Sequence, residues 1–507
     1  MLDCHAFRQS NPIPKRWPGN SHRVTVAAEG MGSRRAMKDQ PRVRLALTLI
    51  AFAIPLAVAL IQPEVGGLEP WGVRVLSVVA ASLVLWLSES LPIGVTSLAV
   101  VAMLALVAPG ESSDGLRGAL AGFQLPAPFF MLGSLALGTA TVRTGLAQRF
   151  ARFLIRGARG SGDRLYGQMV AMMPLMAILV PSALTRSAML IPAYEAIFRS
   201  HRIERGHRLP RLIMLATATI QIQASTAVLT GGSVPVVAGA LLGDLSWARW
   251  FMYMAVPNYA ILFIFAGVLY LLYRPGPMPS SVADEPASEE RGTGPITPIE
   301  WRALAIISAT TLLWLTDGIH GLDPTIPALI GATALFLPVV GVLTWDDFEG
   351  ASPWTIFLVT GSSLSLAVAL SDSGSAQWLA DSIVDNLPLA DLSLVPLLLA
   401  LIGLVAFINV ILPNRTAVLG ITIPLLMSLA TPLGLNPLTV GLIVPIVAQT
   451  TVYYPVQLAT ALVTFRTRHY SAGELFRAGV LLTIVSILVI FLIALPWWSL
   501  LGEPIRA

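Results

Sequence analysis

The sequence predicts an all-α polytopic membrane protein with about 11 transmembrane helices and two re-entrant hairpins, arranged in two inverted-topology repeats. Three observations support this prediction: the composition, the length of the apolar runs, and an internal repeat whose two copies differ in flanking charge. Of the 507 residues, 55% are hydrophobic and only 12% are charged, which is about half the charged fraction of a soluble protein. This composition excludes an intrinsically disordered chain, and the single cysteine, Cys4, excludes a disulfide scaffold.

Apolar runs of about 17–25 residues are long enough to cross the ~30 Å hydrocarbon core as helices. Such runs predict spans near residues 45–61, 73–88, 93–108, 127–145, 212–242, 250–272, 301–316, 325–344, 353–371, 438–465 and 478–498. Residues 1–44 have no apolar core, so we expect a disordered basic tail there and no cleaved signal peptide. Residues 45–69 then hold the first span and an outer loop, and residues 501–507 form a second tail.

The apolar stretch 166–198 does not fit a simple span. Five arginines precede it in residues 149–164 and five follow it in residues 199–211. Because basic loops stay inside, both ends of the stretch are expected on the inner face. The stretch is too short for two spans of about 20 residues each. We therefore predict a re-entrant hairpin that turns near Pro181; one kinked helix followed by an interfacial helix is the alternative.

Three short matches recur in the same order at nearly one offset. These pairs are Trp86-Leu-Ser-Glu-Ser90 with Trp314-Leu-Thr-Asp-Gly318, Gly145-x-Ala-Gln with Gly374-x-Ala-Gln, and Pro181/Pro192 with Pro413/Pro424. The flanking charges change sign between the copies: Arg143, Arg152 and Arg156 correspond to Asp372, Asp381 and Asp385. The second copy, with a hairpin at 392–430, is therefore predicted to have its ends outside and to be inverted.

These features define the expected organisation. Residues 70–274 form repeat 1 and residues 300–500 form repeat 2, joined by the acidic linker 275–299. The basic tail places the N-terminus inside, and counting the spans places the linker inside and the C-terminus outside. We therefore expect a multi-pass protein of the plasma (inner) membrane with a cytoplasmic N-terminus.

Residues 70–500 resemble the divalent anion:sodium symporter family, the sodium/dicarboxylate and sulfate carriers within the ion transporter superfamily. Trp86–Pro92 resembles the family motif W-L-T-E-A-L-P, and Gly133 to Arg149 resembles its glycine-rich helix ending in T-G-L-x-x-R. The family has Ser-Asn-Thr at each hairpin tip, where this sequence has Ser182-Ala183-Leu184 and Asn414-Arg415-Thr416. Thr230–Pro235 and Thr450–Pro455 resemble the family's helix breaks, without the T-P-P-N that usually follows.

The resemblance implies a secondary active transporter for a small divalent anion, such as a C4-dicarboxylate, that works by elevator-like alternating access. It implies a homodimer in the lipid bilayer, a sodium ion at each hairpin tip with its partnering helix break, no other cofactor, and no nucleic-acid partner. The departures from Ser-Asn-Thr leave sodium coupling open. A proton-coupled or sodium-independent anion exchanger, or a non-transporting membrane receptor, is therefore the alternative.

Polar residues at the tips and breaks are the candidate ligands, because broken helices offer free N–H groups to carboxylates and free carbonyls to cations. The candidate substrate ligands are Ser182, Thr185, Arg186, Asn414, Arg415 and Thr416. The candidate sodium ligands are Ser182, Ala183, Gly231, Gly232, Ser233, Asn414, Thr450 and Thr451.

Arg186 and Arg415 are the strongest signals, since a charge at mid-membrane costs about 2.5–3.5 kcal/mol on insertion scales. Each could grip a carboxylate or replace a bound cation. In the alternative interpretation each guanidinium caps hairpin carbonyls or pairs with a buried carboxylate such as Glu195, and the short polar residues only satisfy their own turns. Glu89 is expected to be structural.

The sequence does not favour an enzyme. No predicted span contains a histidine or a Gly-x-Gly-Asp motif. These are the residues from which an intramembrane protease or a histidine-ligated metal centre would be built. We therefore expect neither catalysis nor a metal beyond sodium.

Overall fold

The computed structural model describes residues 41–110, 112–146, 149, 161–180, 182–204, 206–243, 245–276, 278, 295–351, 353–412 and 414–506. Within these ranges all regular secondary structure is helical, apart from isolated bridges such as that between Val65 and Leu68. Residues 1–40 of the predicted basic tail and most of the predicted linker lie outside the described residues. The first described helix begins at Pro41, so the last four residues of the predicted disordered tail are helical.

The first half of the chain contains helices that match the predicted spans and hairpin. Their bounds are α2 (Pro41–Ile61), α3 (Pro70–Ser88), α4 (Ile93–Val107), α5 (Ser112–Ala119), α6 (Ala121–Gln124), α7 (Pro126–Arg143), α9 (Gly162–Leu179), α10 (Ala183–Ser200), α11 (Arg208–Thr219), α12 (Gln221–Thr226), η1 (Leu229–Gly231), α13 (Ser233–Leu241) and α14 (Trp247–Tyr273). Proline at the first helical position favours the starts of α3 and α7, because it has no N–H to leave unpaired there.

The second half has the same kinds of element. Their bounds are α15 (Pro298–Leu315), α16 (Asp317–His320), α17 (Thr325–Phe336), α18 (Trp345–Glu349), α19 (Pro353–Asp372), α20 (Ser375–Asn386), α21 (Leu394–Ile411), α22 (Arg415–Ala430), α23 (Pro437–Thr450), η2 (Pro455–Gln457), α24 (Ala459–Arg466), α25 (Ala472–Val489), the π-helical η3 (Ile490–Ala494) and α26 (Leu495–Leu500).

The structure corrects two details of the sequence prediction. Residues 109–126, expected as a loop, contain the short helices α5 and α6. The span predicted over 325–344 ends as a helix at Phe336, because Pro338 disfavours a helical conformation at Leu337. The acidic segment that follows α19 is also largely helical, as α20.

By length and composition alone, six helical segments in the described part are able to cross a membrane. They are Pro41–Ile61, Pro70–Ser88, Trp247–Tyr273, Pro353–Asp372, Leu394–Ile411 and Ala472–Leu500. Shorter apolar helices accompany them, including Ile93–Val107 and Thr325–Phe336. The coarse prediction of an all-α polytopic membrane protein is confirmed.

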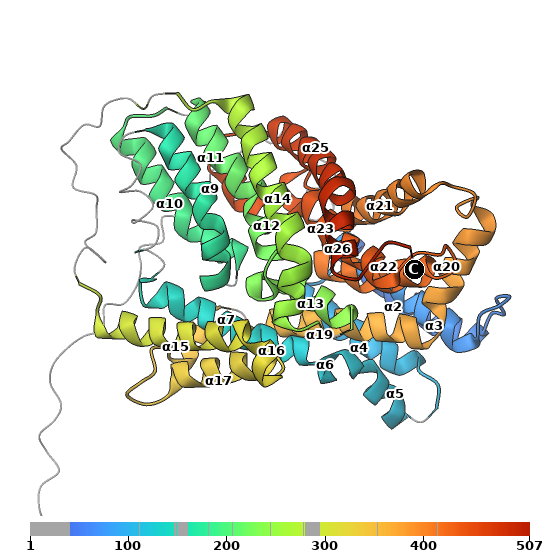
Figure 1. Ribbon diagram of the computed structural model, residues 1–507. Coiled ribbons are helices and arrows are strands. Elements are labelled where there is room, and N and C mark those ends of the chain that lie inside the picture. The colour runs from blue at the N-terminus through green and yellow to red at the C-terminus, as the bar shows by residue number, and fades with distance from the viewer. Residues whose placement is uncertain are drawn as a thin grey trace, which may run out of the picture.

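The helices form two groups (Figure 1). Helices α4, α6, α7, α15, α17 and α19 pack on one another along one side of the molecule, and α9 to α14 stand across them with α23 and α25. Helix α19 contacts both groups, since it packs against α4, α6 and α7 and also against α13 and α22. The space between the two groups is therefore bounded by α7 and α19 on one side.

Two helix–turn–helix pairs occupy the predicted hairpins, and two broken helices follow them. Helices α9 and α10 are joined through residues 180–182, and α21 and α22 through residues 412–414. Side chains close both turns: Ser182 accepts from the N–H of Thr185, and Asn414 accepts from the N–H groups of Thr416 and Ala417. The predicted turn residues Pro181 and Pro413 lie outside the described residues.

The predicted helix breaks are present at both positions. The first lies between α12 and α13, and the second between α23 and α24. Gly231 is required in the first break, because a Cβ atom there would overlap the backbone carbonyl of Ser225. The break is therefore closely folded on its own helix end.

Candidate functional site

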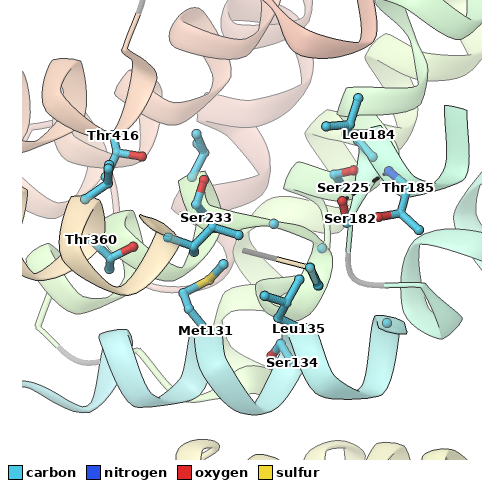
Figure 2. A pocket seen from close by; sticks show the side chains of 18 of the residues that line it. Met131, Ser134, Leu135, Ser182, Leu184, Thr185, Ser225, Ser233, Thr360 and Thr416 are labelled. Atoms are coloured by element: carbon cyan, nitrogen blue, oxygen red, sulfur yellow. Dashed lines mark hydrogen bonds between the residues drawn. The ribbon is translucent and has the colours of Figure 1, made fainter. Parts of the chain in front are cut away.

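A cavity of about 730 Å³ lies where the two helix groups meet. One wall is a face of α7 that runs from Met131 to Arg143, with Thr355 to Thr360 of α19 beside it. The opposite wall is formed by both hairpin turns and both helix breaks. Figure 2 shows Met131, Ser134 and Leu135 on α7, facing Ser182, Thr185 and Ser233 across the cavity.

The structure brings most of the predicted ligands to this one cavity. The predicted residues that line it are Ser182, Ala183, Thr185, Gly231, Gly232, Ser233, Asn414, Arg415 and Thr416. Arg186, Thr450 and Thr451 do not line it and lie behind its wall, where all three are buried. The predicted residues are therefore a single spatial cluster, with a lining layer and a supporting layer.

Arg186 belongs to the supporting layer. Its side chain is only 1% exposed, and its guanidinium donates to the carbonyl of Val180 and to the hydroxyl of Ser225. These bonds join the first hairpin turn to α12, and Gln221 adds a second bond by donating to the carbonyl of Ala183 at 2.9 Å. The geometry matches the interpretation in which Arg186 caps hairpin carbonyls.

Glu195 is not the partner of Arg186. Its carboxylate lies 2.7 Å from Nε2 of His469, in the loop between α24 and α25. The interpretation in which Arg186 pairs with Glu195 is therefore wrong: the carboxylate projects toward the end of the hairpin away from its turn.

Arg415 lies at the second hairpin turn and lines the cavity with 8% of its surface exposed. Its Nη2 donates to the carbonyl of Thr451 at 3.3 Å, at the end of α23. Its Nε and Nη1 have no hydrogen-bond partner among the described residues. Asn409 supports the same junction, since it donates to the carbonyls of Ala448 and Thr451 at 3.0 and 3.4 Å.

The two arginines make similar contacts in the two helix pairs. Arg186 lies in the first turn of α10, and Arg415 is the first residue of α22. Each bonds to the end of the broken helix that follows, at Ser225 or at Thr451. Because the proline pairs align Arg415 with Ala183, the two contacts are alike in kind but come from different positions of the repeat.

Sequence reasoning missed several residues at this junction. Gln223 donates to the carbonyl of Gln449 at 3.2 Å and so joins the two broken helices directly. Gln449 and Ser225 also line the cavity. The signal was present in the chain: Gln223-Ala-Ser225 recurs as Gln449-Thr-Thr451 at an offset of 226.

Few of the residues that line the cavity are charged. Its charged lining residues are Arg143, Asp347 and Arg415. Arg143 forms an ion pair with Asp347, whereas no acidic partner of Arg415 occurs in the described residues. The cavity therefore carries one uncompensated positive charge, at the second hairpin turn, which favours an anionic ligand.

A second cavity of about 400 Å³ lies beside the first and shares Ile93 and Asn414 with it. It is lined by much of the Trp86–Pro92 motif together with Arg44. Arg44 donates to the carbonyls of Ser90 and Glu89, at 2.9 and 3.3 Å. The motif therefore forms a turn that α2 holds in place, and the C-cap position of Glu89 agrees with the expected structural role.

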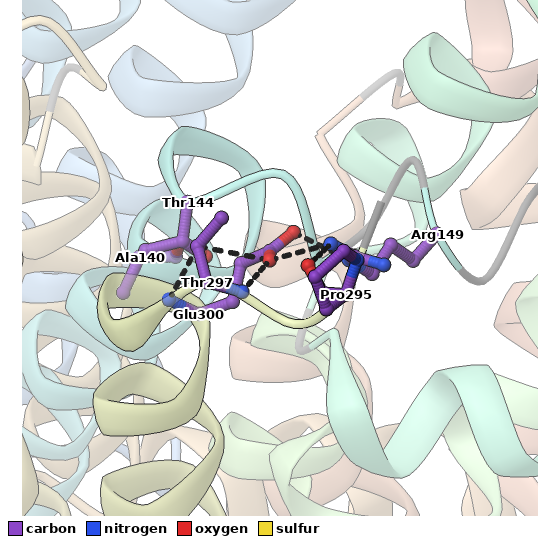
Figure 3. Close-up of polar contacts among 6 residues, drawn as sticks. All are labelled: Ala140, Thr144, Arg149, Pro295, Thr297 and Glu300. Atoms are coloured by element: carbon purple, nitrogen blue, oxygen red, sulfur yellow. Dashed lines mark hydrogen bonds and ion pairs between the residues drawn. The ribbon is translucent and has the colours of Figure 1, made fainter. Parts of the chain in front are cut away.

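The two halves are also joined near the predicted linker. Arg149 binds Glu300 with two hydrogen bonds of 2.6 and 2.8 Å and donates to the carbonyl of Pro295 (Figure 3). Thr297 donates to the same carboxylate through its N–H and its hydroxyl. Glu300 lies just before the predicted span 301–316. These hydrogen bonds lower the pKa of Glu300 to about 2, and the bond from Arg149 contributes most. The carboxylate is therefore ionised at any physiological pH.

The comparisons with known proteins identify a membrane transporter and not an enzyme. The chain belongs to the sodium:sulfate symporter family, because the model of that family's transmembrane region matches residues 42–503. The resemblance seen in the sequence is thereby confirmed.

Named relatives agree with this class. The chain is 22% identical to the chloroplastic dicarboxylate transporter 1 of Arabidopsis thaliana, over 99% of this chain and 93% of that one. It is 20% identical to the L-tartrate/succinate antiporter of Shigella sonnei, over 80% and 87% of the two chains. The YdaH transporter of Alcanivorax borkumensis has a similar fold, with a TM-score of 0.51 and 18% identity over 82% of this chain and 98% of that one.

Proposed function

We propose that the protein is a secondary active transporter for a small divalent anion, with C4-dicarboxylates as the substrate class. The observation that carries this proposal is the cavity, where both hairpin turns and both helix breaks meet around the uncompensated charge of Arg415. The names of the Arabidopsis and Shigella relatives support the substrate class. Its volume of about 730 Å³ is in the range of small-molecule sites, about 300–1,000 Å³.

The proposal includes the topology predicted from the sequence. About 11 spans cross the membrane, and α9–α10 and α21–α22 are re-entrant hairpins that enter from opposite faces. The ordered sequence matches and the change of flanking charge between them support two inverted copies. The helices that carry the hairpins move as one body against α7 and α19, which is the elevator-like step, and the protein is a homodimer in the plasma membrane.

We further propose that transport is exchange of dianions without sodium. The guanidinium groups of Arg186 and Arg415 lie where each hairpin turn meets its broken helix, and they bond to groups of that junction. These are the places where the family resemblance implies sodium ions. A fixed guanidinium supplies the positive charge that a bound cation would otherwise supply.

Flux of labelled succinate into proteoliposomes tests the carrier proposal. Vesicles loaded with unlabelled succinate should accumulate label, and an excess of unlabelled malate outside should reduce this uptake. Empty vesicles with the same protein should accumulate little label if exchange is obligatory. A folded, monodisperse protein that moves no dicarboxylate, tricarboxylate or sulfate under any gradient would support the receptor alternative instead.

A further inference from the structure

Arg143 and Asp347 form an ion pair at the open end of the cavity. Arg143 is the last residue of α7, and Asp347 belongs to the short helix α18. The side chain of Arg143 is 59% exposed and that of Asp347 only 13%. Deeper along the same walls, Ser134 and Thr360 are buried. Nine residues of helix, about 13 Å, separate Ser134 from Arg143, which therefore marks the mouth of the cavity.

The orientation of the pair matters for an approaching ligand. Because the guanidinium is the exposed member and the carboxylate the buried one, an anion entering from water meets the cation first. The fork of a guanidinium can take a carboxylate with two parallel hydrogen bonds. The mouth thus offers a favourable first contact to a dicarboxylate.

Asp347 does not depend on Arg143 for its hydrogen bonds. It takes part in the capping box of α18: its carboxylate accepts from the N–H of Thr344 at 3.2 Å, and its own N–H donates to the hydroxyl of Thr344 at 3.2 Å. If the guanidinium left, the carboxylate would keep these partners and its place. The guanidinium is the exposed member of the pair, so it can turn from Asp347 to another carboxylate at the surface of the cavity.

We propose that Arg143 captures the substrate: its guanidinium exchanges Asp347 for one carboxylate of the entering dianion, before that anion reaches Arg415. Asp347 competes with the substrate for the guanidinium of Arg143. When Asp347 pairs with Arg143 again, the substrate is released toward Arg415. This inference rests on the proposed function and adds a specificity-determining residue outside the predicted hairpin ligands. The sequence alone predicted for Arg143 only the role of a flanking charge that sets the membrane topology.

The test is the initial rate of succinate exchange into proteoliposomes, measured against succinate concentration at two ionic strengths. Arg143→Gln should raise KM about tenfold with little change in Vmax, because a capture contact helps binding and not the later steps. It should also flatten the salt dependence of Vmax/KM, since salt screens the exposed charge. Arg143→Lys should keep the salt dependence and recover part of the affinity.

Asp347→Asn separates capture from a structural role. It should lower KM, because the guanidinium loses its competitor, while the asparagine side chain can still accept from Thr344. The double variant should behave as Arg143→Gln alone. Arg117→Gln, an exposed arginine of α5 away from the cavity, is the matched control and should change neither KM nor the salt dependence.

The outcomes are distinguishable. If wild-type exchange is robust but Arg143→Gln leaves KM unchanged, or if both single variants raise KM alike, the pair is only a structural tie and this inference is wrong. If the wild type exchanges no anion, the proposed function fails, and the capture role with it. Size-exclusion profiles of each variant report whether a loss of rate reflects misfolding.

Discussion

At the residue scale, the chemistry of the cavity centres on Arg415. A buried guanidinium normally satisfies its donors, because an unpaired buried charge is strongly destabilising. Arg415 donates one hydrogen bond to the carbonyl of Thr451, and its Nε and Nη1 have no partner in the described part of the chain. Arg186, in the first hairpin, is held by two bonds and does not line the cavity. The two arginines therefore differ in use: Arg415 faces the cavity and Arg186 supports a turn.

This difference predicts unequal effects of substitution. Arg415→Asn should weaken succinate binding by about tenfold or more, equivalent to at least ~1.4 kcal/mol, because the anion loses its charged partner. Arg415→Lys should recover little if the grip is bidentate and most if only charge matters. Binding is read from the shift in thermal unfolding temperature with succinate concentration.

Arg186 provides the comparison. Arg186→Gln should lower the unfolding temperature without ligand, since it breaks the tie between the first hairpin turn and α12, and it should change succinate affinity less than Arg415→Asn does. An Arg415→Ala protein with unchanged affinity would show that this side chain only caps its own hairpin.

At the element scale, the sequence predicted where helices break better than where short helices form. Prolines, glycine pairs and polar runs mark both hairpin turns and both breaks, and all four lie where they were expected. The short helices α5, α18 and α20 were missed because an apolar run is the signal for a span, and these segments are polar or brief. The glycine-rich break at Gly231 could be recognised in the sequence, whereas its close approach to the backbone of Ser225 is seen only in the structure.

The site was predictable to a similar depth. The tip and break residues converge on one cavity, as expected if the two halves are inverted copies. The contribution of α7 and α19 was not foreseen, since Ser134, Arg143 and Thr360 sit in ordinary helical sequence that only packing turns toward the hairpins. Nor could the pairing of Glu195 with His469 be read from residues 274 positions apart.

The re-entrant topology makes a prediction about these elements. In a Cys4→Ser background, single cysteines at Ser161 and Ser200 should react with a membrane-impermeant maleimide only from the inner face, because one hairpin carries both. Cysteines at Ser382 and Thr431, which flank the second hairpin, should react only from the outer face. Thr431 is preferred to Gly434, whose φ of +65° would strain a cysteine. Labelling of Ser161 and Ser200 from opposite faces would show that the segment between them crosses the membrane once, as a single kinked span, and is not a re-entrant hairpin.

At the scale of the whole molecule, the cavity lies between two groups of helices, and α19 contacts both of them. Gly420 of α22 faces the backbone of Ser363 on α19, where an ideal Cβ would lie 2.9 Å from the carbonyl oxygen. Such a contact allows α22 to lie very close to α19. In the proposed elevator-like step, α22 slides against α19 at this contact.

The same architecture predicts how transport is coupled. A permanent positive charge at each junction of turn and break disfavours a second cation there: two unit charges 4 Å apart repel by about 4 kcal/mol at an effective dielectric constant of ~20, or roughly a thousandfold in affinity. The dianion meets its counter-charge already fixed in the protein. Succinate exchange should therefore proceed at nearly the same rate when external sodium is replaced by choline.

The measurement is counterflow of labelled succinate in proteoliposomes, with sodium or choline outside and monensin added to collapse any sodium gradient. Wild-type rates should be insensitive to both changes. Arg415→Asn should be slower at low succinate and should gain some dependence on sodium, because removing the guanidinium empties a place that a cation can fill. Arg117→Gln controls for a lost surface charge and should follow the wild type. A steep sodium dependence of the wild type would contradict sodium-independent exchange, while leaving the protein a carrier.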